Sequence, residues 1–361
     1  MRIAQIAPLF ESVPPQLYGG TERVVYAVTE QLVRRGHDVT LFASGDSQTS
    51  AELVPMWPCA SRLDPHSIDP IAAQVAMLEY VVQRAHSFDI IHSHVDYYTF
   101  PFVRRTTTPI VTTLHGRLDI PELQPIFRLY GDVPVVSISN SQREPLRDLR
   151  VGWAATVYNG IFTDHFTFSR QPGNYLVFLG RICPEKRPDR AVAIARASGM
   201  PLKVAAKIDK VDREYYETTI APLFEDPLVE YIGEVDEQAK AALLRDAYAL
   251  LFPIDWREPF GLTMVEALAC GTPVIAMRGG SVEEVLVDGE TGFVCDTLDE
   301  MIASVPRVAE LDRRRCREQV DAHFSADVMA AHYEEVYEHL LVQRRQPLIT
   351  PVLKSRSVGL S

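Results

Sequence analysis

Short apolar runs alternate with amphipathic stretches along almost the whole length of this 361-residue chain. The runs are four to eight residues long, rich in β-branched residues and apolar on both faces, as strands buried in a covered parallel sheet must be. Alternation of strands and helices at this spacing predicts an α/β protein built from βαβ units in doubly wound sheets. The runs occupy residues 2–9, 38–44, 89–94, 109–116, 134–140, 155–160, 175–180, 203–208, 229–234, 249–254, 273–277 and 292–296.

Helical patterns lie between these runs. The clearest cover 21–36, where Gly36 is a natural C-terminal cap, 189–199 and 236–247. Their apolar residues recur with a helical period, so each helix is expected to cover one face of a sheet.

A polar, turn-rich stretch at 162–174, FTDHFTFSRQPGN, interrupts the alternation just before a fresh strand. We therefore predict two Rossmann-like domains, 1–165 and 166–325, facing each other across a cleft, because ligands of doubly wound sheets bind beyond the carboxyl ends of the strands. The amphipathic helix at 326–345 is expected to pack back toward the first domain. The tail at 346–361 has no hydrophobic period, which is typical of a disordered end.

Charge and cysteine usage narrow the class of protein. A formal net charge of −12 argues against general nucleic-acid binding, which needs a basic surface, and weakens a case for docking on anionic lipid. The five cysteines are scattered and never spaced C-x-x-C, which is typical of reduced thiols. No apolar run approaches the ~18–20 residues of a membrane span. We expect a soluble, cytoplasmic protein.

Two glutamates in REPFGLTMVEALACGTPVIA (257–276) need an explanation. Glu258 follows a strand, at the edge where ligands bind, and Gly261 opens a helix whose first N–H groups form an anion site. Glu266 lies about one turn inside that helix among apolar residues, and burial of a carboxylate is costly unless a partner compensates it. The pattern favours a carboxylate that accepts hydrogen bonds from ligand hydroxyls, with pairing to an arginine as the alternative.

Cations gather in a second cluster, FLGRICPEKRPDRAV (178–192). Arg181 follows a strand and Lys186 precedes a helix, which suits the charge of a phosphate group. Plain surface cations are an equally good reading of this cluster alone.

Glycines and histidines mark the first domain. Gly19 and Gly20 precede a helix and permit close approach of backbone to a ligand, although a dinucleotide fingerprint is absent. His115 and His94 stand at strand ends, so His115 is a candidate for the site and His94 for the acceptor side. No D-x-D sequence occurs, and we predict no metal site.

Together these residues resemble the family 4 glycosyltransferases of the GT-B fold. The likeness runs from YGGTERVV through TLHG, VYNGI and GRICPEK to EPFGLTMVEALACGTPVIA and GGSVEEVLVDGETGFV. It implies a retaining hexosyltransferase that moves a sugar from a nucleotide diphosphate to a hydroxyl of a small-molecule, glycan or lipid-linked acceptor. UDP is favoured by its frequency in the family, and neither a metal nor another cofactor is implied.

The resemblance also assigns roles to the second-domain residues that match its motifs. Arg181 and Lys186 would hold the diphosphate and stabilise the charge that develops on it. The backbone amides at the helix start would assist them, those of Phe260, Gly261, Leu262 and Thr263.

Further positions follow from the same carry-over. Glu266 would bind the ribose hydroxyls and Glu258 those of the donor sugar. From the first domain His115 would face that sugar, and Gly19 and Gly20 would close over the phosphates and the sugar.

Three positions have a less definite relation to the family. Asn159, in VYNGI, matches a position near the interdomain hinge. The stretch 205–217, AAKIDKVDREYYE, stands where many relatives have a glycine-rich turn, so that Lys207 and Lys210 become candidates for contact with nucleotide or phosphate.

Other activities fit the same cleft. A disaccharide phosphorylase would use the anion site for phosphate, and an epimerase would act on the nucleotide sugar itself. A two-carboxylate hydrolase is less consistent, because Glu266 lies inside a helix next to the phosphate site. A non-catalytic sensor conflicts with the intact set of Arg181, Lys186, Glu258 and His115.

Overall fold

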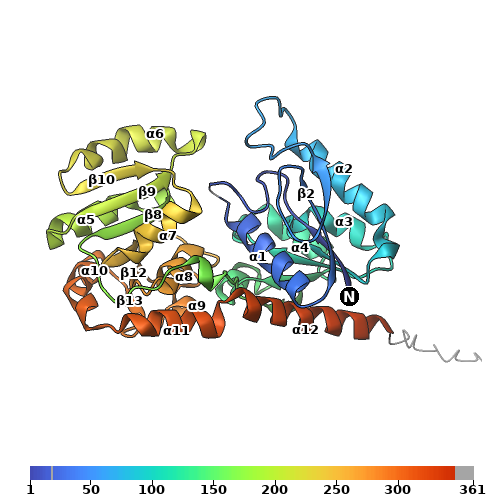
Figure 1. Cartoon of the computed structure of the whole chain (residues 1–361). Helices are drawn as coiled ribbons and strands as arrows, with labels where there is room; N and C mark the ends of the chain where they lie inside the picture. Colours follow the sequence, from blue (N-terminus) through green and yellow to red (C-terminus); the bar gives the residue numbers. More distant parts are fainter. Residues whose placement is uncertain (18, 346–361) are drawn as a thin grey trace, which may run out of the picture.

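The computed structural model describes residues 1–17 and 19–345, and two parallel sheets organise them (Figure 1). The first sheet has seven strands in the order β3-β2-β1-β4-β5-β6-β7, and the second has six in the order β10-β9-β8-β11-β12-β13. The strands are β1 (Arg2–Ile6), β2 (Asp38–Ser44), β3 (Glu52–Trp57), β4 (Ile90–Ser93), β5 (Ile110–Leu114), β6 (Pro134–Ser137), β7 (Gly152–Thr156), β8 (Leu176–Arg181), β9 (Leu202–Lys207), β10 (Val229–Gly233), β11 (Ala249–Phe252), β12 (Val274–Met277) and β13 (Gly292–Cys295).

Helices connect successive strands and cover the faces of both sheets (Figure 1). They are α1 (Gly20–Arg34), α2 (Pro70–Gln83), α3 (Phe100–Val103), α4 (Leu123–Leu129), α5 (Pro188–Ser198), α6 (Arg213–Tyr215), α7 (Glu237–Arg245), α8 (Leu262–Ala269), α9 (Val282–Val285), α10 (Leu298–Ser304), α11 (Arg313–His323) and α12 (Ala326–Arg345).

Each sheet reverses its strand order once. The first sheet reverses at β1 and β4, and the second at β8 and β11. At such a point the loops leaving neighbouring strands diverge to opposite faces and open a crevice. The predicted α/β architecture of two doubly wound sheets is confirmed.

Helix α1 illustrates how the local sequence makes these elements. Val24, Val28 and Leu32 recur every four residues on one helix face and are at most 1% exposed. Gly36, with a φ of +86°, follows the helix end and turns the chain toward β2.

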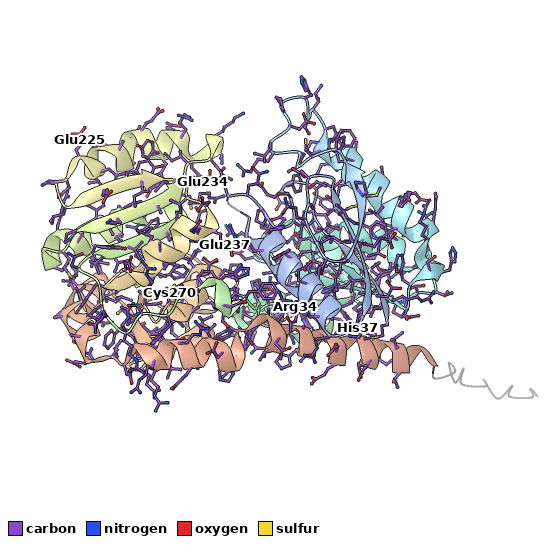
Figure 2. The ribbon with its side chains drawn as sticks, in the orientation of Figure 1. Arg34, His37, Glu225, Glu234, Glu237 and Cys270 are labelled. Carbon is purple, nitrogen blue, oxygen red and sulfur yellow. The ribbon has the colours of Figure 1, made fainter. Side chains whose placement is uncertain are left out.

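The chain passes between the two sheets twice, and the two passages pair. The amide of Ile161 donates to the carbonyl of Phe324 at 2.9 Å, and the amide of Ala326 donates back to Ile161 at 2.8 Å. Helix α12 then lies along the first half of the molecule (Figure 1). His37 sits near it (Figure 2), with its Nε2 2.6 Å from Glu334.

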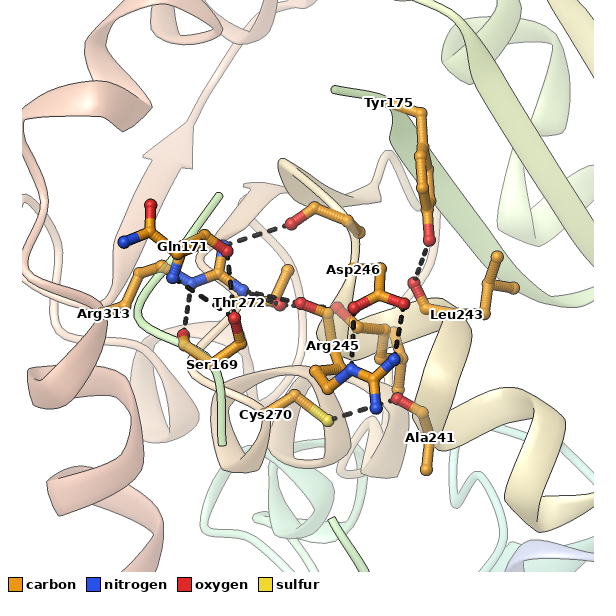
Figure 3. A network of polar contacts seen from close by, with 12 residues as sticks. Ser169, Gln171, Tyr175, Ala241, Leu243, Arg245, Asp246, Cys270, Thr272 and Arg313 are labelled. Atoms are coloured by element: carbon orange, nitrogen blue, oxygen red, sulfur yellow. Dashed lines mark hydrogen bonds and ion pairs between the residues drawn. The ribbon is translucent and has the colours of Figure 1, made fainter. Parts of the chain in front are cut away.

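A buried arginine fixes the linker to the second half. Arg313 of α11, 6% exposed, donates to the carbonyl oxygens of Ser169, Ala247 and Arg245 at 2.9–3.2 Å and to Thr272 Oγ1 at 2.6 Å (Figure 3). Four donated bonds satisfy a guanidinium that burial would otherwise destabilise.

Two details of the predicted strands are wrong. The edge strand β3, ELVPMW, was missed, because it is half-exposed and contains Pro55, which interrupts the apolar pattern. The run at 155–160 overlaps β7 only at its end, since 157–160 already belong to the first passage between the sheets. The tail 346–361 lies outside the described residues.

Candidate active site

A cleft of about 630 Å³ opens between the carboxyl ends of the two sheets. Its lining comes from both halves of the chain and includes every residue proposed for the site from sequence except His94 and Lys210. These residues are Gly19, Gly20, His115, Arg181, Lys186, Glu258, Phe260, Gly261, Leu262, Thr263 and Glu266.

Local backbone geometry sets the start of α8 in the cleft. Gly261 has a φ of +78°, and a Cβ there would lie 2.6 Å from the Met264 side chain, so only glycine fits the turn. The first N–H groups of α8 have no partner within the helix and point out of its end. This end of α8 therefore presents donors and a positive partial charge to the cleft.

The loop before α8 is held from both sides. Ser281 donates from its amide to the carbonyl of Glu258 at 3.0 Å and from its Oγ to Phe260 at 2.8 Å. From the first half of the chain, Ser139 Oγ donates to the carbonyl of Pro259 at 2.6 Å. These bonds fix the direction in which Glu258 and the α8 amides point.

Glu258, 8% exposed, has two partners from its own wall. Its Oε2 is ion-paired with Lys186 Nζ and accepts a hydrogen bond from Trp256 Nε1 at 3.0 Å. The Lys186 ammonium also lies 5.2 Å from the ring centroids of Phe252 and Trp256. The carboxylate and the ammonium compensate each other's burial and both line the cleft.

Glu266, 3% exposed, is ion-paired with Lys240 of α7. The partner of this carboxylate is thus a lysine on a neighbouring helix and not an arginine. Lys240 takes Oε1, while Oε2 bonds to no described residue and is not fully buried, so it opens on the cleft. The ion pair makes the burial of Glu266 tolerable and leaves one oxygen for a ligand.

Cations also stand at the ends of β8 and β9. Arg181 Nε lies 3.3 Å from Asp212 and its terminal nitrogen 3.6 Å from Asp209, while Lys207 Nζ lies 2.8 Å from Asp209. The loop carrying the two aspartates therefore positions Arg181 and Lys207 at the cleft wall. Of the two lysines proposed in this stretch, Lys207 lines the cleft and Lys210 does not.

His94 is buried behind His115 and not exposed to the cleft. It is 1% exposed, its Nδ1 is 2.9 Å from His115 Nε2, and its Nε2 is 2.9 Å from Gln5 Oε1. The chain of hydrogen bonds continues through the first half to α12: Gln5 to Tyr337 (3.2 Å), Tyr337 to His92 (2.7 Å), His92 to Thr113 (2.8 Å) and Thr113 to Tyr333 (2.9 Å).

The three histidines of this hydrogen-bonded network, His92, His94 and His115, are neutral. Burial lowers the pKa of His92 and His115 to about 3, and burial lowers that of His94 well below its usual value, with a contribution from the neighbouring rings. His115 Nδ1 bonds to no described residue and is not fully buried, so a neutral ring edge faces the cleft. The fixed partner at Nε2 orients that edge.

Asp96 supports the backbone beneath His115. Its Oδ1 accepts a hydrogen bond from the His115 amide at 3.4 Å, and the residue has a left-handed φ of +46°. Burial raises the pKa of Asp96 to about 6, while hydrogen bonds from the amides of His115 and Gly116 oppose the shift. Beside it, the Arg117 guanidinium lies 5.6 Å from the Trp256 ring centroid, so the two walls touch here.

Sequence reasoning missed several lining residues. Lys240 gave no local signal, because its role depends on α7 packing beside α8. Trp256, two residues before Glu258, was within reach of a motif reading. Glu22 stands inside YGGTERVV but was not singled out. Asn159, which sequence placed only near the interdomain hinge, lines the cleft and carries a buried Oδ1 without a described partner.

Within 1–17 and 19–345, no group of three or more His, Cys, Asp or Glu side chains is arranged to hold a metal ion. In the same part of the chain, none of the helices has the length and apolar character needed to cross a bilayer.

Comparison with known proteins covers nearly the whole chain. The family model "Glycosyltransferase Family 4" matches residues 18–165, and "Glycosyl transferases group 1" matches 163–320. A phosphatidyl-myo-inositol mannosyltransferase of Mycobacterium leprae is 26% identical, covering 94% of this chain and 96% of its own. N-acetyl-alpha-D-glucosaminyl L-malate synthase of Bacillus anthracis is also 26% identical, covering 90% and 94%.

Solved structures share the fold at lower identity. Sucrose-phosphate synthase of Thermosynechococcus elongatus superposes with a TM-score of 0.76 at 19% identity, covering 95% of this chain and 99% of its own. HepE of Anabaena, solved with UDP and glucose, has a TM-score of 0.73 at 16% identity, covering 94% and 100%. The chain belongs to the group 1, family 4 glycosyltransferases, enzymes of the GT-B fold that transfer a sugar from a nucleotide-sugar donor.

Proposed function

We propose that this enzyme is a retaining, metal-independent hexosyltransferase that uses a UDP-sugar and glycosylates a hydroxyl of its acceptor. The observation that carries the proposal is the meeting of Arg181, Lys186, Lys207 and the start of α8 in one cleft. The second half (166–325) binds the donor in this proposal, and the first half (1–165) binds the acceptor.

Breaking the bond between the sugar and the diphosphate leaves negative charge on the diphosphate. Fixed cations and helix N–H groups stabilise that charge where it develops and need no reorganisation at that moment. Lys186 and the α8 amides are held in place by the contacts described above, so they are suited to this role. With these groups present the leaving group does not require a divalent ion.

The two glutamates bind hydroxyls in this scheme. Glu266 Oε2, open to the cleft, accepts hydrogen bonds from the ribose, while Lys240 keeps Oε1. Glu258 accepts hydrogen bonds from the donor sugar and shares Lys186 with the diphosphate. Both carboxylates belong to one wall and each is bound by a lysine, so they do not face each other across a bond to be cleaved.

Retention then follows from displacement on one face of the sugar. The acceptor oxygen bonds to the anomeric carbon as the diphosphate oxygen leaves it, and the acceptor proton passes to the departing diphosphate. His115 presents a neutral edge to the sugar, so it binds a hydroxyl without placing a charge beside the reaction. Closure of the cleft excludes water and limits hydrolysis.

UDP is preferred as the nucleotide on the family resemblance, and it is the nucleotide named in the HepE complex. The test has two stages. Thermal shift across UDP, GDP and ADP and their sugars should give the largest rise in melting temperature with a uridine ligand, because a bound ligand stabilises the native state by mass action. UDP release from that sugar should then rise when acceptor is added and persist in EDTA.

Three results would redirect the proposal. Sugar released only in the presence of inorganic phosphate would indicate a phosphorylase, and conversion of the sugar without UDP release would indicate an epimerase. Product of inverted anomeric configuration, read by NMR, would exclude retention.

A further inference from the structure

Glu22 is a buried carboxyl in the cleft wall that none of the roles above uses. It lies in the first turn of α1, is 5% exposed and lines the cleft. Its carboxylate makes no hydrogen bond or ion pair with another described residue. A carboxyl group nine-tenths buried and without a partner among the described residues calls for a ligand that supplies one.

The other charges on the same wall are already paired. Arg23 is ion-paired with Glu237 and donates to the Leu17 carbonyl at 2.6 Å. Glu11 is ion-paired with Arg62, and Arg117 is 2.6 Å from Asp119. Among the described residues of the first half that line the cleft, Glu22 alone has a charged group without such a pair.

Gly19 keeps the carboxylate of Glu22 open. A Cβ at Gly19 would lie 3.2 Å from Glu22 Oε2 and 2.7 Å from the Pro15 side chain, so any other residue would press on both. The neighbouring Gly20 faces Leu262 at the start of α8, with 3.6 Å between its built Cβ and Leu262 Cδ1. Glu22 thus stands two residues along α1 from the place where the two walls meet.

The charged groups that act on Glu22 belong to its own half of the molecule. Burial raises the pKa of Glu22 to about 7, a hydrogen bond from its own amide lowers it, Glu11 raises it, and Arg62 and Arg23 lower it. The ionised carboxylate repels an anion beside it, whereas a hydroxyl can donate a hydrogen bond to it.

We propose that Glu22 binds a hydroxyl of the acceptor and that the acceptor is an uncharged polyhydroxyl compound, a sugar or a polyol. This inference rests on the proposed function, because it concerns the acceptor side of the same cleft. In the transfer step the acceptor oxygen forms its bond to the anomeric carbon and its proton goes to the leaving diphosphate. Glu22 orients the acceptor and does not take the proton.

The charges around Glu22 determine which acceptors the cleft binds. A phosphate or carboxylate next to the reacting hydroxyl would approach Glu22 on a wall whose cations are all neutralised by acidic partners. The site discriminates against such groups because their binding would bring the ligand's negative charge close to the Glu22 carboxylate in a partly desolvated site. Neutral acceptors lack this penalty.

The test compares matched neutral and anionic probes in the presence of UDP. Binding of glucose, N-acetylglucosamine and myo-inositol is measured beside glucose 6-phosphate, glucuronate and myo-inositol 1-phosphate, for the wild type and for Glu22→Gln. We expect the wild type to bind at least one neutral probe and to reject the matched anion by tenfold or more. In Glu22→Gln we expect weaker binding of the neutral probe by about tenfold and loss of most of the discrimination.

Two controls keep the outcome readable. Glu79→Gln, the same change on the exposed surface of the first half, should alter neither measurement. The Kd for UDP should stay within twofold in Glu22→Gln, which also shows that the variant folds. Three outcomes would each overturn the inference, provided that UDP still binds. The wild type could bind anionic probes as well as neutral ones, it could bind no neutral probe, or Glu22→Gln could be indistinguishable from the wild type. Failure of the wild type to bind any nucleotide would instead count against the proposed function.

Discussion

The two walls of the cleft stabilise their buried polar groups in different ways. The first wall is formed by residues of the first half of the chain (1–165) and the second wall by residues of the second half (166–325). On the second wall, carboxylates are paired with lysines: Glu258 with Lys186 and Glu266 with Lys240. On the first, neutral imidazoles, an amide and phenols form one chain of hydrogen bonds from His115 to α12. Both walls are built from the carboxyl ends of parallel strands, so the difference lies in the side chains and not in the fold.

This contrast indicates what each wall is suited to bind. The ion pairs keep charged side chains at the surface of the cleft, and a charged ligand can replace one member of a pair. A neutral chain presents directional donors and acceptors with little net field, which suits hydroxyl groups. The second wall therefore suits a nucleotide diphosphate, and the first suits sugars.

Of the changes to the second wall, removal of Lys186 should reduce activity most. Lys186→Ala deletes the cation proposed for the leaving diphosphate and leaves Glu258, 8% exposed, without its ion-pair partner. We expect kcat/KM for the donor to fall by about 10²–10³-fold, similar to the loss of one preorganised donor in other active sites. Steady-state UDP release measures this.

A matched variant separates charge at the site from charge in general. Lys203→Ala removes a lysine paired with Glu230 at 3.5 Å, outside the cleft lining, and should leave kcat/KM within twofold. Full activity in Lys186→Ala with a normal melting temperature would refute the role given to the second wall.

Acid should destabilise the first wall, because its buried histidines are neutral in the native state. The folded-state pKa of His92 and of His115 is about 3, below the unfolded value of 6.5, so the unfolded chain binds protons that the native state does not. Stability is then present above pH 6.5 and is lost as the pH falls toward 3, by about 1.4 kcal/mol per pH unit for each ring. Between pH 6.5 and 4.5 the native state therefore loses about 2 kcal/mol for each of His92 and His115, and the lowered pKa of His94 acts in the same direction.

Two buried carboxyls of the same half oppose this loss. Glu22 and Asp96 have folded-state pKa values raised to about 7 and 6, so they destabilise the native state at high pH and this effect disappears as the pH falls. Together they return about 4 kcal/mol between pH 6.5 and 4.5, which is less than the loss from the three histidines, so a net loss of stability remains. Urea unfolding at both pH values should show it, and His92→Gln should reduce the pH dependence. An unchanged dependence in His92→Gln would mean that His92 is not held neutral.

Much of the fold could be predicted because it depends on local patterns. Strands buried on both faces of a parallel sheet leave unbroken apolar runs, and the predicted runs overlap twelve of the thirteen strands. The edge strand β3 leaves no such run, since one side of it meets solvent.

The candidate site divides along the same line. The loop and helix from Glu258 to Glu266 are contiguous in sequence, so the relation between the two glutamates could be inferred. Gln5 and Tyr337 are 332 positions apart, and their contact exists only because α12 returns to the first half. His94 was proposed for the acceptor side because it stands at a strand end, yet it is buried, because helices cover both faces of the sheet.

The Glu266–Lys240 pair allows a milder test of the charged wall. Lys240→Met keeps most of the apolar stem and removes the ammonium, so Glu266 is left buried beside the proposed ribose site. We expect the Kd for UDP to rise about tenfold and the melting temperature to fall, since removal of one member of a buried pair leaves the other uncompensated. Titration of UDP by calorimetry checks the first effect and a thermal melt the second.

A double variant completes that comparison. Lys240→Met with Glu266→Gln should recover stability, because the uncompensated charge is gone. It should not recover the affinity for UDP fully, because an amide has one acceptor oxygen where the carboxylate has two. Complete recovery of both would show that the pair is structural only.

The smallest expected effect sharpens the description of the neutral wall. Gln5→Leu removes the bonds to His94 Nε2 and to Tyr337 and leaves His115 in place but less firmly oriented. We expect kcat to fall by up to about tenfold, or about 1.4 kcal/mol, with the Kd for UDP unchanged, because we propose that the donor's nucleotide binds to the other wall. Gln83→Leu on the exposed end of α2 is the control. If Gln5→Leu weakened UDP binding as much as it lowered kcat, the separation of the two walls would be wrong, since the loss would then have spread through the whole cleft.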